Sequence, residues 1–230
     1  MGKGTVINLH THTTFSDGLF DIETIVFEGA RNGLTHVAIT DHFETTKVRS
    51  LKLRDFEKYV DAIETIRRKY EGTIEVLAGI EIDTNPYRCD FVSIPRRIFE
   101  SLDIALFEYV GNIPAGGASI ETVGDFASNL PVQCGLAHPD FEVAFSSRDP
   151  HELAKKLGEY NFFVEINTAR IYRRDGVPYY ERAADLISEL RSSVKFSIGT
   201  DVHRTISEIF NVKNAYEFAR RLGISDRLIY

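Results

Sequence analysis

The sequence lacks long apolar runs and is poor in cysteine, and both shortages exclude classes of protein. No apolar run approaches the roughly 20 residues that a membrane-spanning helix needs, so we expect no association with a membrane. The opening segment MGKGTVINLH lacks the long apolar stretch of a secretory signal peptide. These two absences predict a cytoplasmic protein.

The two cysteines are Cys89 and Cys134. Their spacing fits neither a zinc-binding motif nor a disulfide framework. Cys134 lies inside the apolar run 132–136, which predicts a buried and unreactive thiol.

The formal net charge of −7 argues against binding to extended nucleic acid, because phosphate backbones attract basic surfaces. We expect no nucleic-acid partner beyond nucleotide-sized substrates. With 230 residues, 43% of them hydrophobic and 27% charged, the chain can form a full core. No linker rich in glycine, serine or proline and no internal repeat divides it, so residues 1–230 are expected to form one domain.

Short apolar runs rich in valine, isoleucine and phenylalanine alternate with segments of helical periodicity. The expected strands are residues 5–9, 36–40, 74–82, 103–107, 132–137, 162–166 and 195–198. The expected helices are residues 21–32, 54–70, 119–129, 149–157, 179–190 and 207–222. Such alternation is typical of parallel strand–helix–strand units, so we predict a single α/β domain.

Nine residues, each a histidine, an aspartate or a glutamate, lie at or just beyond the ends of these runs. They are His10, His12, Asp17, His42, Glu81, Glu108, His138, Asp201 and His203. The carboxyl ends of parallel strands lie at one end of a sheet or barrel, where α/β proteins place their sites. A closed or nearly closed barrel would bring all nine together, and their chemistry is that of a multinuclear metal site.

The nine positions differ in how strongly each one predicts metal binding. His10 and His12 are two apart on a strand, so both imidazoles face the same side and can bind one metal ion. Glu81 ends an otherwise apolar strand, where an unpaired carboxylate is costly and a cation is the economical partner. Asp17 lies in a turn-like stretch, where an aspartate alone is more typical of a turn or cap than of a ligand. Asp41 is placed to orient a ligand.

Two further histidines serve as a comparison. His36 begins an expected strand at the opposite end, and His151 falls in the first turn of an expected helix. Neither should bind metal.

The order of these motifs along the chain resembles the PHP family, which is named after DNA polymerase and histidinol phosphatase members. It runs from His10-x-His12 through a loop Asp17, Thr40-Asp41-His42, Gly79-x-Glu81 and His138 to Asp201-x-His203. The resemblance implies a distorted (β/α)7 TIM-like barrel with two or three divalent metal ions, Zn, Mn or Fe. It also implies a hydrolase that usually acts on phosphoesters.

The resemblance also implies how the ligands divide among the metals. One ion would be held by His10, His12, Glu81 and Asp201. A second would be bridged by Glu81 and held by His138, and a third would use Asp17, His42 and His203.

The chain departs from the family pattern after the fourth strand. The family usually has a histidine ligand for the second metal there, whereas this sequence reads Leu-Phe-Glu-Tyr-Val over residues 106–110. Glu108 is the expected substitute, because a carboxylate can replace an imidazole on Zn²⁺, Mn²⁺ or Fe²⁺. The alternative is a solvent-facing or arginine-paired Glu108.

The predicted reaction is hydrolysis of a phosphomonoester of a small molecule or nucleotide by a metal-activated water. Histidinol phosphate is one possible substrate. We predict Glu81, Asp201 and His203 as catalytic residues. The substrate phosphate is expected to bind to Arg170, Arg173 and Arg204 in a forked geometry.

Two other functions stay open. A metal-dependent amidohydrolase would use the same activated water on an amide carbonyl, with less need of arginines. A noncatalytic subunit of an RNA–protein complex is the third class, and such a subunit would be expected to have lost the ligands that this chain retains.

Overall fold

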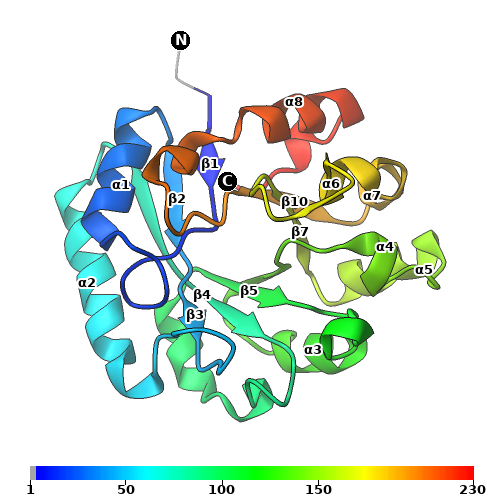
Figure 1. Ribbon diagram of the computed structural model, residues 1–230, viewed down its shortest axis with the longest axis horizontal. Helices are drawn as coiled ribbons and strands as arrows, with labels where there is room; N and C mark the ends of the chain where they lie inside the picture. Colours follow the sequence, from blue (N-terminus) through cyan, green and yellow to red (C-terminus); the bar gives the residue numbers. More distant parts are fainter. Residues whose placement is uncertain (1–3) are drawn as a thin grey trace.

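Parallel strands surrounded by helices form a nearly closed barrel in the computed structural model, which describes residues 4–230 (Figure 1). The first three residues of the segment MGKGTVINLH lie outside the described residues. The strands follow one another around the barrel as β1 (Ile7–Asn8), β2 (His36–Ile39), β4 (Glu75–Asp83), β5 (Ile104–Glu108), β6 (Gln133–Leu136), β7 (Phe163–Asn167) and β10 (Lys195–Gly199).

The barrel closes where β10 returns to the segment that follows β1. The amide of Leu9 donates to the carbonyl of Ile198 at 2.8 Å, and the amide of Asp201 donates to the carbonyl of His10 at 2.9 Å. Each of the strand pairs in this sheet is parallel. The prediction of a single-domain, TIM-like α/β barrel is therefore confirmed, and all seven expected strands are present within one or two residues at most ends.

Helices surround the barrel (Figure 1). They are α1 (Ile22–Arg31), α2 (Phe56–Lys69), α3 (Ile120–Ala127), α4 (Phe141–Ala144), α5 (Pro150–Glu159), α6 (Tyr179–Arg182), α7 (Ala184–Leu190) and α8 (Lys213–Leu222). Short 3-10 turns occur at Leu53–Asp55, Phe91–Ser93, Arg96–Ser101, Ile113–Ala115, Ile206–Phe210 and Ser225–Arg227. At the start of α1 the side chain of Asp21 accepts a hydrogen bond from the amide of Thr24 at 2.8 Å and so caps the helix.

The structure corrects two helix predictions. The expected helix 179–190 is interrupted at Ala183 between α6 and α7, and the expected helix 207–222 begins as a 3-10 turn before α8. Apolar periodicity separates a 3-10 turn from an α-helix poorly, because the two repeats differ by about half a residue per turn.

Three very short strands were not predicted. Strand β3 (His42–Phe43) pairs with β4, and β8 (Arg173–Arg174) pairs with β9 (Val177–Pro178) as a hairpin. Two residues are too few to show a strand pattern in a sequence.

The core lies between the barrel and its helices and includes fully buried Tyr59, Phe99 and Phe107. Cys89 and Cys134 are buried and unpaired, as predicted for Cys134, and burial raises the pKa of each thiol to about 12.

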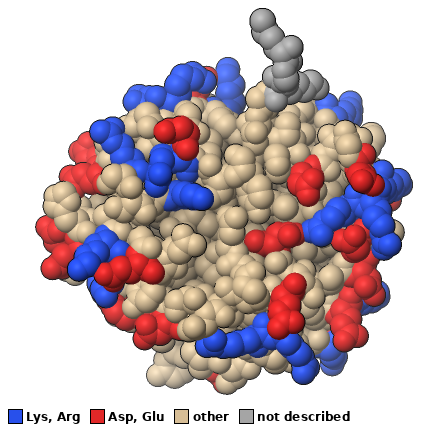
Figure 2. All heavy atoms as spheres, turned by 180° about the vertical axis from the view of Figure 1, so that it is seen from behind, with Lys and Arg blue, Asp and Glu red and all other residues tan. Residues whose placement is uncertain are grey.

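Among the described residues, no helix is both long and apolar enough to span a membrane. On the face shown in Figure 2, basic and acidic side chains of the described residues are interspersed around the edge and form no continuous basic surface.

Candidate metal centre

Side chains from the carboxyl ends of six strands converge on one place. The structure brings together all nine predicted residues there, at the ends of or just beyond β1, β2, β4, β5, β6 and β10. Three sets of ligand-type atoms lie close enough to share an ion. The sets are His10, His12, Glu81 and Asp201, then His12, Asp17, His42 and His203, and then His42, Glu81 and Glu108.

The first set has the spacing of a coordination shell. The Nε2 atoms of His10 and His12 are 3.0 Å apart, and they lie 3.2 and 2.9 Å from Asp201 Oδ1. The carboxylate of Glu81 completes the set at 3.5 Å from His10 Nε2 and 3.4 Å from His12 Nε2. Ligands bound tetrahedrally at 2.0–2.1 Å from one ion lie roughly 3.3–3.4 Å apart, so these residues fit a divalent cation.

Several atoms of the centre are close to a partner yet make no hydrogen bond. Among the buried polar atoms of residues 4–230, those without a hydrogen-bond partner include Asp17 Oδ1, His42 Nδ1, Glu81 Oε2 and Asp201 Oδ1. His42 Nδ1 lies only 2.9 Å from Glu81 Oε2, but the two are not aligned for a hydrogen bond. Leaving such atoms unsatisfied is costly, and a cation between them would satisfy their lone pairs.

The electrostatics of the first set favour a bound cation. Burial alone would raise the pKa values of Glu81 and Asp201, but nearby His10 holds both well below their usual range. Burial, together with the neighbouring His42, lowers the pKa of His12 to about 3. The carboxylates therefore keep their charge while His12 keeps a free lone pair, which is the state that metal ligands require.

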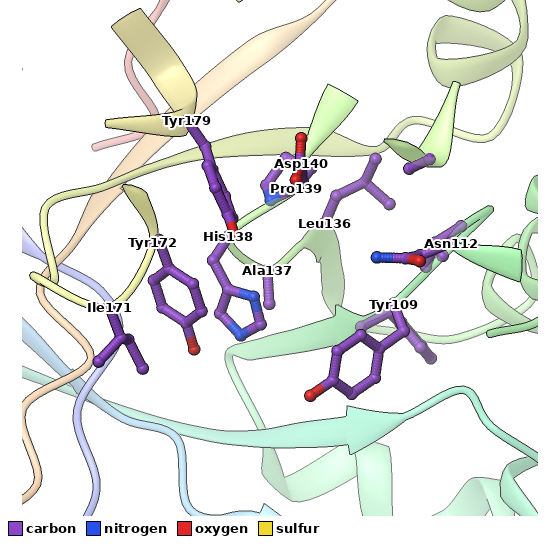
Figure 3. Close-up of a pocket in the computed structure, with 13 residues that line it drawn as sticks. Tyr109, Asn112, Leu136, Ala137, His138, Pro139, Asp140, Ile171, Tyr172 and Tyr179 are labelled. Carbon is purple, nitrogen blue, oxygen red and sulfur yellow. The ribbon is translucent and has the colours of Figure 1, made fainter. Parts of the chain in front are cut away.

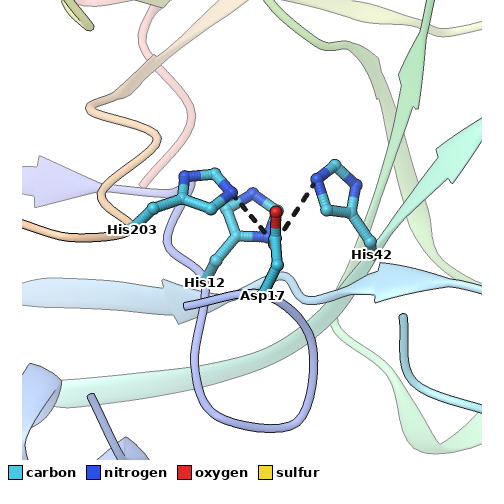
Figure 4. A group of neighbouring side chains, drawn as sticks. All are labelled: His12, Asp17, His42 and His203. Atoms are coloured by element: carbon cyan, nitrogen blue, oxygen red, sulfur yellow. Dashed lines mark ion pairs between the residues drawn. The ribbon is translucent and has the colours of Figure 1, made fainter. Parts of the chain in front are cut away.

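The second set lies at the mouth of the same centre (Figure 4). Asp17 Oδ1 is 3.2 Å from His203 Nε2 and 3.8 Å from His42 Nε2, and the ring of His12 stacks on that of His203 with centroids 4.0 Å apart. His203 Nδ1 lies 2.8 Å from the backbone carbonyl of Asp201, which points its Nε2 toward Asp17. Although burial works against both shifts, the pairing raises the pKa of His203 to about 9 and lowers that of Asp17 to about 2.

The loop that carries Asp17 is held by Asp41. The Asp41 carboxylate accepts from the amide and hydroxyl of Thr13 at 2.8 and 2.7 Å and from those of Ser16 at 3.0 and 2.5 Å. Asp41, predicted to orient a ligand, therefore makes these hydrogen bonds to the loop that carries Asp17. Gly18 is required in this loop because a Cβ there would overlap the backbone of His12.

Glu108 is buried beside the centre, but its partner is a lysine. Its oxygens lie 3.8 Å from His42 Nδ1 and 4.0 Å from His138 Nε2, and both accept hydrogen bonds from Lys47 Nζ, at 2.7 and 2.6 Å. The solvent-facing alternative for Glu108 is wrong, since its side chain is 1% exposed. No pattern in the sequence predicts Lys47 at this position.

The three arginines predicted to bind phosphate are exposed. The Arg170 side chain is 82% exposed with Nε 3.8 Å from Glu208, and Arg173 donates to the carbonyl of Gly176 at 3.2 Å. Arg204 is exposed next to His203 in the chain.

Of the comparison histidines, His36 lies at the start of β2 and His151 is exposed in the first turn of α5, both as predicted.

Two residues of the centre were missed by sequence reasoning. Glu165, on β7, accepts from the amide of His138 at 2.6 Å and lies 2.9 Å from His10 Nδ1. Tyr172 donates its hydroxyl proton to Asp201 Oδ2 at 2.7 Å and stacks on His138 with ring centroids 4.0 Å apart. Space around Glu165 is so limited that a Cβ on Gly199 would overlap its Oε1.

A pocket of about 250 Å³ opens beside His138. Figure 3 shows His138 between the rings of Tyr172 and Tyr109, with Ile171 and Tyr179 near the same opening. The pocket walls are mainly aromatic and apolar, so it can hold an organic group next to the predicted metals.

Residues 8–107 match the model of the PHP domain family. This segment contains five of the nine predicted residues, namely His10, His12, Asp17, His42 and Glu81. The predicted PHP resemblance is confirmed. The chain is also 29% identical to an uncharacterized protein of Methanocaldococcus jannaschii, over 94% of this chain and 88% of that protein. It is 31% identical to the DNA polymerase/3'-5' exonuclease PolX of Bacillus subtilis, over 34% of this chain and 14% of PolX.

Solved structures support the PHP-like barrel. The histidinol phosphate phosphatase of Lactococcus lactis, whose crystal structure is a complex with Zn, L-histidinol and phosphate, matches with a TM-score of 0.66. The match covers 96% of this chain and 94% of that chain at 16% identity. At this identity the likeness establishes the fold.

Proposed function

We propose that this protein is a metal-dependent hydrolase that cleaves phosphomonoesters of small molecules or nucleotides. The observation that carries the proposal is the position of Glu81, which is fully buried between the ligand sets. Its carboxylate lies 2.9 Å from both His42 and His138 and within 3.5 Å of His10. A carboxylate so placed is suited to bridge neighbouring cations, as two-metal phosphoester hydrolysis requires.

The residues present fit divalent ions, and Zn, Mn or Fe agrees with the mixed nitrogen and oxygen donors. His10, His12, Glu81 and Asp201 would hold one ion, and Asp17, His42 and His203 would hold another. Bound ions of this kind lower the pKa of water toward neutrality and neutralise phosphate oxygens.

The chain itself supplies position and shape. Tyr172 fixes the Asp201 carboxylate through its hydroxyl, and Glu165 fixes the ring of His10. We place the organic part of the substrate in the pocket between Tyr109 and Tyr172, where a flat ring can stack on the aromatic side chains. Among the catalytic residues proposed, Glu81 and Asp201 would hold the ions, and His203 lies at the more exposed mouth, with its side chain 23% exposed.

The arginines remain part of the proposal, with Arg204 first because it follows His203 directly. Arg204→Ala should weaken selection for the phosphate group by roughly ten- to a hundredfold, the usual effect of losing a charge-assisted contact. Arg191→Ala is the matched control, since Arg191 is exposed before β10, at the opposite end of that strand.

The test is a phosphatase screen of the purified protein after separate reconstitution with Mn²⁺, Zn²⁺, Fe²⁺ and Mg²⁺. We expect turnover of a subset of phosphomonoesters with at least one of these ions and none with the Glu81→Gln variant. A metal-loaded protein that ignores a broad phosphoester panel yet cleaves amides would establish the amidohydrolase alternative instead. Loaded protein with no hydrolytic activity would favour the noncatalytic alternative.

A further inference from the structure

Lys47 is a partly buried cation directed at the carboxylate expected to bind the second metal. Its Nζ lies 2.7 and 2.6 Å from the two oxygens of Glu108, so both oxygens are engaged by one ammonium group. The side chain of Lys47 is 22% exposed and that of Glu108 is 1% exposed. Little water therefore competes with this contact.

The ammonium lies at the edge of the same cluster of acids and imidazoles. Glu108 faces His42 Nδ1 at 3.8 Å and His138 Nε2 at 4.0 Å, and both of these nitrogens are 2.9 Å from Glu81. In the first ligand set, the distances between imidazole nitrogens and carboxylate oxygens are shorter, at 2.9–3.5 Å. The carboxylate of Glu108 is thus drawn away from the two imidazoles and toward Lys47.

The backbone and an aromatic ring hold Lys47 in place. The hydroxyl of Thr45 accepts from the amide of Lys47 at 3.1 Å and donates to the buried Asp83 at 3.1 Å, which fixes the start of the loop. The Lys47 ammonium also lies 5.0 Å from the centroid of the Tyr109 ring, a cation–π contact. Tyr109 adopts a left-handed φ of 64°, an unfavourable conformation for a non-glycine residue that the surroundings must stabilise.

We propose that the Lys47 ammonium takes the place of the second divalent cation, so that the centre binds two metal ions and one fixed organic cation. This inference rests on the proposed function, because it assumes that the other two ligand sets hold metal. Glu108 is then the partner of Lys47, which revises its predicted role as a metal ligand. The replacement explains why Glu108 stands after β5 where the family usually has a histidine. The carboxylate of Glu108 neutralises the Lys47 ammonium, whereas a neutral imidazole would not.

Metal counting tests the inference without reference to activity. The wild type and the Lys47→Met, Lys47→Arg and Lys52→Met variants would be saturated with Zn²⁺, desalted, and measured by native mass spectrometry and elemental analysis. Lys52 is the matched control, because it lies in the same loop with similar exposure and bonds to Ser50 and Thr45 instead of the centre. We expect two ions per chain for the wild type, Lys47→Arg and Lys52→Met, and three for Lys47→Met.

Three ions in the wild type would overturn the inference, as would a Lys47→Met variant that folds and still binds two. If Lys47→Met does not fold, anomalous scattering from Zn²⁺-soaked wild-type crystals decides. A zinc peak bonded to Glu108 and His138 would overturn the proposal, and peaks confined to the other two sets would support it.

The two proposals fail in distinguishable ways. Two ions in the wild type and three in Lys47→Met, with no phosphoester turnover, would support the role of Lys47 and contradict the proposed reaction. Phosphoester turnover with three ions in the wild type would do the reverse.

Discussion

Glu165 and His10 form a fully buried pair, with Glu165 Oε1 2.9 Å from His10 Nδ1. Because a carboxylate only accepts, Nδ1 of the imidazole carries a proton, and Nε2 faces His12 and Asp201. Because the other oxygen of Glu165 accepts from the amide of His138, one carboxylate aligns two predicted ligands from different strands.

Replacing Glu165 should therefore weaken metal binding without removing a ligand. We expect Glu165→Gln to lower metal affinity by about 10- to 100-fold, the usual effect of losing an outer carboxylate partner. Competition with a chromophoric chelator measures it. Glu189→Gln, on the exposed side of α7, is the control and should match the wild type. Equal affinities for all three proteins would show that Glu165 does not orient His10.

The carboxylates of the centre should control turnover and not substrate affinity. Glu81→Gln and Asp201→Asn remove charges that would hold metal, so kcat should fall below detection, whatever the substrate concentration. Steady-state kinetics of a phosphomonoester identified by the screen would show this. The exposed substitution Glu71→Gln provides the comparison. A variant with normal kcat and only a raised KM would contradict the assignment.

Metal removal should destabilise the folded protein. A ligand that binds only the folded state stabilises it by about 2.7 kcal/mol at a hundred times its Kd, and chelation also leaves buried carboxylates such as Glu81 without a cation. The Tm measured by calorimetry should fall after EDTA treatment and dialysis and recover when Zn²⁺ or Mn²⁺ is returned. An unchanged Tm would mean that the centre does not hold metal in the folded state.

The hydroxyl of Tyr172 should matter more than its ring. Tyr172→Phe keeps the stacking on His138 and loses the hydrogen bond to Asp201, a bond to a charged group that contributes about 1.5–3 kcal/mol. We expect kcat/KM to fall by roughly tenfold or more, while circular dichroism stays unchanged. Tyr87→Phe serves as the control, because Tyr87 is 94% exposed. Identical kinetics for the two variants would exclude a role for the hydroxyl.

Asp21 should stabilise the protein in a pH-dependent way. Its hydrogen bond to the amide of Thr24 keeps the pKa of Asp21 below its ordinary value, so the folded state favours the charged carboxylate. Asp21→Ala should cost about 1 kcal/mol at pH 7. Because the folded-state pKa is the lower one, this stabilisation is present above about pH 4 and is lost as the pH falls through the folded pKa. Urea unfolding of the wild type and Asp21→Ala at pH 7 and near pH 3 measures the difference in their free energies of unfolding. A difference that is the same at both pH values would argue against the cap.

Strand ends were predictable because parallel topology fixes where they lie. Once His10, His138 and Asp201 follow buried parallel strands, their side chains must meet at one end of the barrel, and the structure places them there. Glu165 carried the same signal as Glu81, a lone carboxylate in an apolar strand, and could have been found by applying that criterion again.

Other features left no pattern to detect. Lys47 reaches Glu108 from an irregular loop, and loop geometry does not follow from apolar periodicity. Arg170 and Arg173 follow a strand end closely along the chain, but exposed side chains have no packing constraint that directs them inward.

Gly199 carries a consequence for related sequences. A Cβ at this position would overlap Glu165 Oε1 and the Cβ of His10, so a larger residue can replace Gly199 only if these side chains shift or change. A relative that keeps a glutamate at the position of Glu165 should keep glycine at the position of Gly199, and one with a larger residue at the glycine position should have lost the glutamate as well. Paired variation at these two sites would therefore separate chains with a complete centre from those in which the barrel has been adapted to another use.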